Sequence, residues 1–243
     1  MRRVIALGLA ALLSILIFSV SVAPASAQIV LPARTGFSLG GSYYSSSSSN
    51  PTYSYNSHTW YAAATYSRMM SPTWDLFLTY GGYRSNTRYT YTSGDVYNYS
   101  YAQDTLTVGG RLHLGNGTSG FDPYVFGGVS YWSYRSSTVS TPAGGSPTTT
   151  ASNSLSGPGA LGGVGASLQL SPKLTLFGNV YGYYYSMSGT QTTATGTNAI
   201  AQSRFSYGTE LGASYRIREN LDVYAMVLSG WPASATVGFT WSP

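Results

Sequence analysis

Hydrophobic and polar residues alternate with a period of two over most of the chain after residue 34. The clearest example is the segment 204–217. One set of alternate positions there, beginning with Phe205, is apolar, and the other set, beginning with Arg204, is small or polar. Successive side chains of a β-strand point to opposite faces, whereas a helix would scatter these residues around its axis. The segment is therefore predicted to be a strand with one apolar and one polar face.

Similar alternation predicts ten strands along the chain. They are expected at residues 35–45, 58–70, 74–84, 99–114, 121–134, 158–170, 173–187, 203–217, 220–229 and 234–242. Each strand approaches the length of about 9–11 residues that a tilted strand needs to cross a bilayer. The alternation is weakest in 58–70 and 220–229, and the last connection is short, so a count of eight strands stays open.

Short and long connections alternate between the predicted strands. The short ones are 71–73, 115–120, 171–173 and 218–220, and the long ones are 46–57, 85–98, 135–157 and 188–202. Tight periplasmic turns and long extracellular loops alternate in this way in outer-membrane barrels. Because hydrocarbon offers no hydrogen-bond partner to an open sheet edge, such a sheet must close. The predicted fold class is all-β, a closed antiparallel up-and-down transmembrane β-barrel.

The composition separates this fold from its alternatives. Only 8% of the residues are charged, whereas typical proteins use about 25%. A hydrophobic content of 43% argues against a disordered chain. A soluble β-sandwich would bury the apolar face and expose Ser and Gly, which are poor substitutes for surface charges. An exterior in contact with lipid excludes charge, because a charged side chain at the bilayer midplane costs about 2–4 kcal/mol. The membrane barrel is therefore favoured.

Net charge and cysteine content exclude further classes of protein. The formal net charge is +5, but the basic residues are scattered and form no stripe that would bind nucleic acid. The chain contains no cysteine, which excludes a disulfide scaffold and a cysteine-based zinc site.

The N-terminal residues 1–27 have the pattern of a secretory signal peptide. Two arginines precede an apolar run, and the segment ends in small residues around Pro24, with cleavage expected after Ala27. An N-terminal membrane anchor is the alternative, but Pro24 and the small residues favour cleavage. We expect a short periplasmic segment at 28–34 and the barrel domain at 35–243. The expected location is the bacterial outer membrane, after export through the inner membrane.

Two strings carry a resemblance to a known group. Residues 122–131 read Asp-Pro-Tyr-Val-Phe-Gly-Gly-Val-Ser-Tyr, and residues 237–241 read Val-Gly-Phe-Thr-Trp. With the signal peptide, they make the chain resemble small bacterial outer-membrane β-barrel proteins of the porin-like or opacity type. The resemblance implies outer-membrane lipid as the surroundings and the barrel assembly machinery as a partner during biogenesis. Trp241 is followed by Ser242 and Pro243 instead of ending the chain, which departs from the assembly signal.

Aromatic residues near the predicted strand ends are expected to form a belt at the membrane interfaces. The predicted belt consists of Trp60, Trp74, Tyr80, Trp132, Tyr184, Tyr215 and Trp241. For the run Tyr183 to Tyr185, stacking on a ligand is the alternative.

Charged residues on the polar faces are expected to meet inside the barrel. The predicted lumen network consists of Asp75, Arg111, His113, Arg204, Glu210, Arg216 and Asp222. Because buried charges must be paired, Glu210 is expected to contact Arg111 or Arg204. The network is expected to fill a narrow barrel, and a gate or ion path is the alternative. Ten strands are too few for an open porin channel.

Catalysis has little support in the sequence. The only histidines are His58 and His113, and Ser57 and His58 are adjacent, so their side chains should point to opposite sides of a strand. No cluster has metal-ligand spacing, and no cofactor is expected. We expect a non-enzymatic role in envelope structure or surface interaction through loops rich in Tyr, Ser and Thr, which could contact an extracellular ligand or protein. A narrow channel for small solutes or ions is the second hypothesis, and an outer-membrane protease or lipid hydrolase is the third.

Overall fold

The computed structural model describes residues 35–115, 120–229 and 234–243. The predicted signal peptide at 1–27 and the predicted segment 28–34 lie outside the described residues. Among the described residues, no helix is long and apolar enough to cross a membrane.

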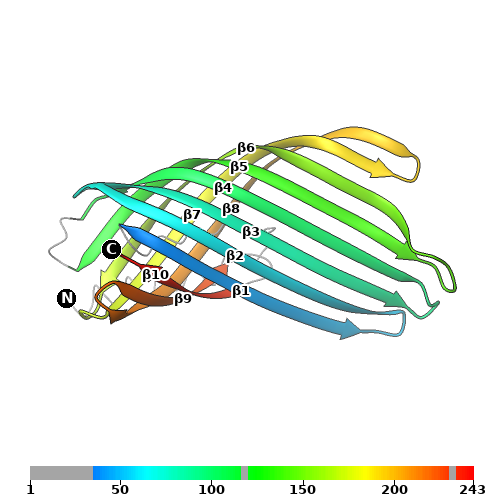
Figure 1. Ribbon diagram of the computed structural model, residues 1–243, viewed down its shortest axis with the longest axis horizontal. Helices are drawn as coiled ribbons and strands as arrows, with labels where there is room; N and C mark the ends of the chain where they lie inside the picture. The colour runs from blue at the N-terminus through cyan, green and yellow to red at the C-terminus, as the bar shows by residue number, and fades with distance from the viewer. Residues whose placement is uncertain (1–34, 116–119, 230–233) are drawn as a thin grey trace.

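The described chain forms a closed barrel of antiparallel strands, in which each strand pairs with its neighbours in sequence and β1 pairs with β10 (Figure 1). The strands are β1 (Gly36–Ser49), β2 (Tyr53–Ser71), β3 (Trp74–Tyr91), β4 (Val96–His113), β5 (Phe121–Thr141), β6 (Thr148–Gln169), β7 (Leu174–Thr193), β8 (Gly196–Arg218), β9 (Leu221–Ser229) and β10 (Ser234–Trp241). The predicted fold class is confirmed, and the count is ten rather than eight.

The prediction of long outer loops is wrong. The segments 46–57, 85–98, 135–157 and 188–202 are mostly strand, and the turns that remain are 50–52, 92–95, 142–147 and 194–195. These segments carry few aliphatic residues, and in 46–57 and 85–98 the period of two appears only in tyrosines such as Tyr53 and Tyr55 or Tyr89 and Tyr91. Tyr and Thr nevertheless favour extended backbone, and each hairpin continues its hydrogen-bond ladder past the apolar band.

The apolar faces point outward and the polar faces point inward, as predicted. On β4, Val108 is 51% exposed, whereas its neighbour Thr107 is 1% exposed. On β8, Phe205 is 69% exposed, whereas Glu210 is 2% exposed. A soluble protein rarely exposes an apolar surface of this extent. The soluble β-sandwich is therefore excluded as the fold, because it would bury these apolar residues.

The wall of the barrel is uneven in height. β1 pairs with β10 only over Phe37–Gly41, and β8 pairs with β9 only from Thr209 onward. Ser42–Ser49 of β1 and Gly196–Gly208 of β8 therefore each have one edge without a strand partner among the described residues. In Figure 1 the short β9 and β10 stay at one end, while the other strands continue. The outer half is a curved sheet running from β1 to β8, with one side open.

Large rings fill the lumen because glycines make room for them. A Cβ atom on Gly163 would collide with the carbonyl oxygen of Val180 and lie 2.7 Å from Cβ of Tyr181 and 2.8 Å from the ring of Phe126. The neighbouring Gly162 points outward, where a Cβ atom would come no closer than 3.7 Å to another atom.

This difference gives a test of the inside and outside assignment. Gly163→Ala should lower the free energy of unfolding by about 1–3 kcal/mol, the usual cost of overpacking, whereas Gly162→Ala should change it little. Urea unfolding of both variants in detergent, followed by tryptophan fluorescence, measures the difference. Equal stabilities would contradict the assignment.

Candidate functional site

A cluster of charges lies inside the barrel near the end where β1 begins and β10 ends, which is predicted to be periplasmic. The Asp75 carboxylate on β3 accepts hydrogen bonds from Nη2 of Arg111 at 2.8 Å and from Nε2 of His113 at 2.9 Å. All three side chains are buried, and Asp75 is 0% exposed. The register explains the contact, because Asp75 lies opposite Arg111 and His113 follows two positions later on the same face of β4.

The imidazole of His113 connects a second carboxylate to the cluster. Its Nδ1 lies 2.6 Å from Oδ2 of Asp122, at the start of β5. A carboxylate only accepts hydrogen bonds, so contacts at both ring nitrogens fit an imidazolium that donates twice. Two positive and two negative groups then compensate one another. The lumen network predicted from the sequence did not include Asp122, although the alternation already placed this residue on the polar face of its strand.

Neutral side chains extend the cluster across the lumen. The Arg111 guanidinium lies 5.1 Å from the ring centre of Tyr124. The Tyr124 hydroxyl donates to Oδ1 of Asn179 at 2.7 Å, and Nδ2 of Asn179 donates to Oε2 of Glu210 at 2.9 Å. The contacts therefore run from β3 to β8. Glu210 joins the cluster through Asn179, and its expected contact with Arg111 or Arg204 stays a prediction.

The remaining predicted charges lie apart from this cluster. Arg216 pairs with Asp222 at 3.2 Å at the periplasmic end, where the Arg216 side chain is half-exposed. Arg204 lies farther along β8, opposite Tyr185. The seven residues predicted from the sequence are thus inward-facing but do not form one network through the contacts described above.

Trp132 corrects the predicted aromatic belt. It is 1% exposed and lies inside the barrel, where its ring centre is 5.5 Å from that of Tyr183 and 5.0 Å from that of Tyr185. The inward position follows from alternation, because its neighbour Tyr131 faces outward. Tyr183 and Tyr185 are also buried, so they pack in the core and offer little free surface to a ligand.

The other predicted belt residues face outward. Their exposed fractions lie between 39% and 51% for Trp60, Trp74, Tyr80, Tyr184, Tyr215 and Trp241. Their interfacial role stays a prediction.

A second group of tyrosines lines the inner face of the open outer half. Neighbouring rings in the group have centres 4.9–5.8 Å apart. The group, called the tyrosine trough below, consists of Tyr53, Tyr55, Tyr83, Tyr89, Tyr91, Tyr97, Tyr99, Tyr101 and Tyr134. The rings are partly exposed, and Tyr99 is 43% exposed. The trough therefore combines flat apolar ring faces with hydroxyl groups.

The outward face of the same strands carries a separate polar arrangement. The imidazole Nδ1 of His58 lies 2.7 Å from the Tyr43 hydroxyl. Ser57 faces inward and shares a hydrogen bond with Thr87 at 2.8 Å. Ser57 and His58 thus lie on opposite faces and do not form a nucleophile and base pair.

An ion pair lies on the outward face of β3 and β4. Arg84 contacts both carboxylate oxygens of Asp104, at 2.8 and 2.9 Å, and Tyr80 donates to the same carboxylate at 2.9 Å. The Arg84 guanidinium also lies 5.8 Å from the ring centre of Trp60. These contacts fix a positive side chain beside two outward aromatic residues.

The turn between β3 and β4 holds a further carboxylate. Asp95 accepts a hydrogen bond from the Ser93 hydroxyl at 2.8 Å and one from the backbone N–H of Ala143 at 3.0 Å. Both hydrogen bonds lower the pKa of the Asp95 carboxyl below its ordinary value, and the bond from Ser93 has the larger effect. Asp95 thereby links its own turn to the turn between β5 and β6.

Within residues 35–115, 120–229 and 234–243, no group of three or more His, Cys, Asp or Glu side chains is arranged to hold a metal ion.

No protein-family profile and no curated protein sequence matches this chain. Solved structures do match it. The translocator domain of the autotransporter NalP from Neisseria meningitidis matches with a TM-score of 0.52 and 14% identity, over 87% of this chain and 90% of that domain. The outer membrane protease OmpT from Escherichia coli matches with a TM-score of 0.51 and 9% identity, over 86% of this chain and 94% of the protease. The fold is that of an outer-membrane β-barrel. At these identities the barrel shares an architecture with both proteins, and the likeness carries neither translocation nor proteolysis over to it.

Removing the central carboxylate tests the lumen cluster. Asp75→Asn keeps the side-chain size but leaves Arg111 and His113 buried without it, so the free energy of unfolding should fall by about 3–5 kcal/mol. Asp222→Asn is the matched control, because its partner Arg216 is half-exposed, and should cost about 1 kcal/mol or less. Guanidinium unfolding in detergent compares the two. Similar losses for both variants would contradict a buried cluster.

The Asp95 link should depend on pH. Because the folded pKa is lowered, the stabilisation is complete above the unfolded pKa of about 3.9 and is lost as the pH falls through the lower folded value. Hydrogen exchange at the Ala143 amide, corrected for intrinsic rates, should report protection at neutral pH that disappears in acid. Asp95→Ala should remove this protection at every pH, and unchanged protection in that variant would refute the link.

Proposed function

We propose that this protein is a non-enzymatic outer-membrane barrel that binds a neutral extracellular oligosaccharide in the tyrosine trough. The observation that carries the proposal is the group of nine tyrosines on the inner face of the open outer half. Such rings present broad, rigid surfaces at a low cost in conformational entropy.

The chemistry of the trough matches a neutral sugar polymer. Flat ring faces can pack against the C–H faces of sugar rings, while tyrosine, serine and threonine hydroxyls both donate and accept hydrogen bonds. Beside the rings, the inward-facing residues include Ser57, Thr87 and Gln103, which are uncharged. A long ligand could also leave through the open side between β1 and β8, since neither edge is covered there by a described strand.

The filled lumen argues against the alternative of a narrow channel. The contacts from Asp122 through Asp75 and Arg111 to Glu210 cross the barrel near its periplasmic end. Farther out, Trp132 stacks on Tyr183 and packs at a tilt against Tyr185 within the core. A solute would have to displace both layers to pass. A role in recognition needs no such movement.

Binding of neutral oligosaccharides tests the proposal. The purified barrel, in detergent, is applied to an array of neutral and charged glycans, and the strongest neutral binder is then titrated by calorimetry. Tyr89→Ala should weaken binding at least tenfold, because Tyr89 contacts Tyr53, Tyr55 and Tyr99. Tyr131→Ala is the control, since that ring faces outward, and should leave the affinity within about twofold, a difference below ~0.5 kcal/mol.

Two results would overturn the proposal. One is the absence of any neutral glycan ligand, and the other is equal affinity in the Tyr89 and Tyr131 variants. Planar-bilayer recordings on the same preparation address the channel directly, because discrete conductance steps in the unmodified protein would support transport instead.

A further inference from the structure

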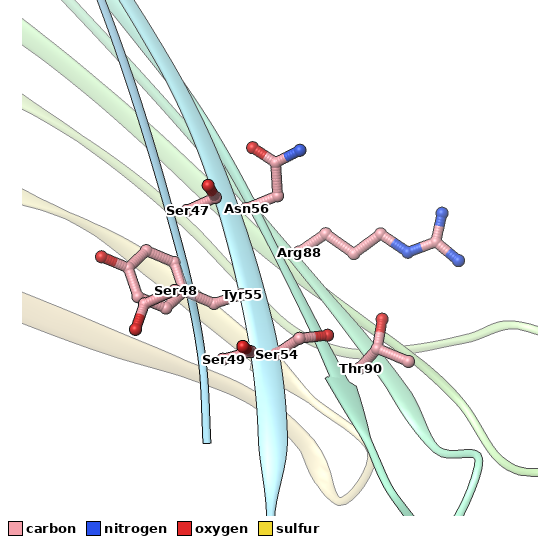
Figure 2. Close-up of a pocket in the computed structure, with 8 residues that line it drawn as sticks. All are labelled: Ser47, Ser48, Ser49, Ser54, Tyr55, Asn56, Arg88 and Thr90. Atoms are coloured by element: carbon pink, nitrogen blue, oxygen red, sulfur yellow. The ribbon is translucent and has the colours of Figure 1, made fainter. Parts of the chain in front are cut away.

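A groove lies on the outward face of β1, β2 and β3 near their extracellular ends, with a volume of about 430 Å³. Two rows of paired residues form it. One row is Ser47, Asn56 and Arg88, and the other is Ser49, Ser54 and Thr90. Figure 2 shows Asn56, Arg88 and Thr90 pointing to one side of the sheet, and Tyr55 and Ser48 pointing to the other. Ser48 and Tyr55 line the groove as well, so it borders the tyrosine trough at Tyr55. The six outward side chains lie on the face of the sheet opposite the rings of the trough.

Every one of these six outward side chains can form hydrogen bonds, and one is a cation. Arg88 is exposed and makes no ion pair with any residue that the structure describes. A guanidinium group presents a planar fork of donors that matches phosphate in a bidentate manner. The serine and threonine hydroxyls and the Asn56 amide both donate and accept, which suits the hydroxyl groups of a sugar. The groove is therefore equipped for a ligand that carries phosphate and sugar together.

The position of the groove indicates where that ligand comes from. On β2 the outward residues run from Asn56 through His58 to Trp60, which faces outward with 45% exposure. At about 3.3 Å per residue and with the strand tilted, Asn56 lies roughly 10 Å beyond Trp60 along the membrane normal. This is the depth of large lipid headgroups. A ligand anchored in the outer leaflet would reach the groove from the same side as the apolar exterior.

The surface between the groove and the apolar band suits the same ligand. Arg84 lies opposite Trp60 and is held there by Asp104, with its side chain still 31% exposed. The outward face of β3 thus carries two guanidinium groups, four residues apart, and the single carboxylate of this region is already paired. A headgroup with more than one phosphate would find a second cation nearer the bilayer.

We propose that the groove binds the phosphorylated sugar headgroup of an outer-leaflet lipid. Arg88 contacts a phosphate, the row of Ser47 and Asn56 contacts sugar hydroxyls, and Trp60 lies at the level where the headgroup meets the acyl chains. This site holds the barrel to its lipid from the outward face of the sheet, whereas a glycan in the tyrosine trough would contact the inward face.

Lipid binding by charge-matched variants tests the site. The purified barrel in a non-ionic detergent is titrated with lipopolysaccharide that carries a phosphorylated core and with the same lipid after enzymatic dephosphorylation. Arg88→Gln should weaken binding of the phosphorylated lipid at least tenfold. Arg218→Gln, which removes the same charge from the end of β8 at the opposite end of the barrel, should change it less than twofold. Dephosphorylated lipid should bind the unmodified protein and Arg88→Gln equally weakly.

Further titrations separate the headgroup from simpler ligands. Asn56→Ala should weaken binding of the phosphorylated lipid several-fold without changing the weak binding of inorganic phosphate. Glucose 6-phosphate and inorganic phosphate should each bind far more weakly than the lipid, and equal affinity for either would place the natural ligand in solution and overturn the proposal. Equal lipid affinity of Arg88→Gln and Arg218→Gln would overturn it as well. A heated sample of each variant that migrates more slowly on a gel than the unheated sample confirms that the unheated variant is folded.

Discussion

Closure of the backbone hydrogen-bond ladder in the inner half of the wall is the constraint on which the rest of this structure depends. A sheet in hydrocarbon has no solvent to satisfy its edges, so the first and last strands must meet. Once the ring is closed, alternate side chains have only two environments. Those facing outward are selected for lipid, and those facing inward must satisfy one another within a narrow lumen. The glycines beside Phe126 and Tyr181 are part of the same constraint, since the wall leaves no other space for the rings.

The inward charges show what closure requires of a narrow barrel. Asp75 cannot reach water, and it is stable only because Arg111 and His113 donate to it from the next strand. The neutral Asn179 then carries the contacts on to Glu210. This arrangement lets charged groups occupy the lumen through paired and neutral partners. The molecule is thus divided into a base with a filled lumen and an outer half that is open on one side.

Alternation in the sequence predicted ten strands, with eight as the alternative, and the inward side of the charged residues assigned to the lumen. Register, in contrast, depends on turn geometry and on pairing across strands, so contact partners such as Asp122 with His113 could not be derived. Trp132 was assigned to the aromatic belt because it lies near a predicted strand end. The alternation of side chains along that strand, by contrast, gives its correct inward orientation. The outer strand extensions were missed because they carry few aliphatic residues. On β2, β3 and β4 the period of two is present there only in the tyrosines, as at Tyr97, Tyr99 and Tyr101.

The short β9 and β10 have a mechanical consequence. In the inner half each strand is held on both sides, so the curvature of the wall is set by the ring as a whole. In the outer half, β1 and β8 are each paired with a neighbouring strand on one side only. Their unpaired edges can therefore approach or separate without breaking any strand pair. A change in the distance between these edges would thus leave the strand pairing of the inner half, and with it the lumen cluster, intact.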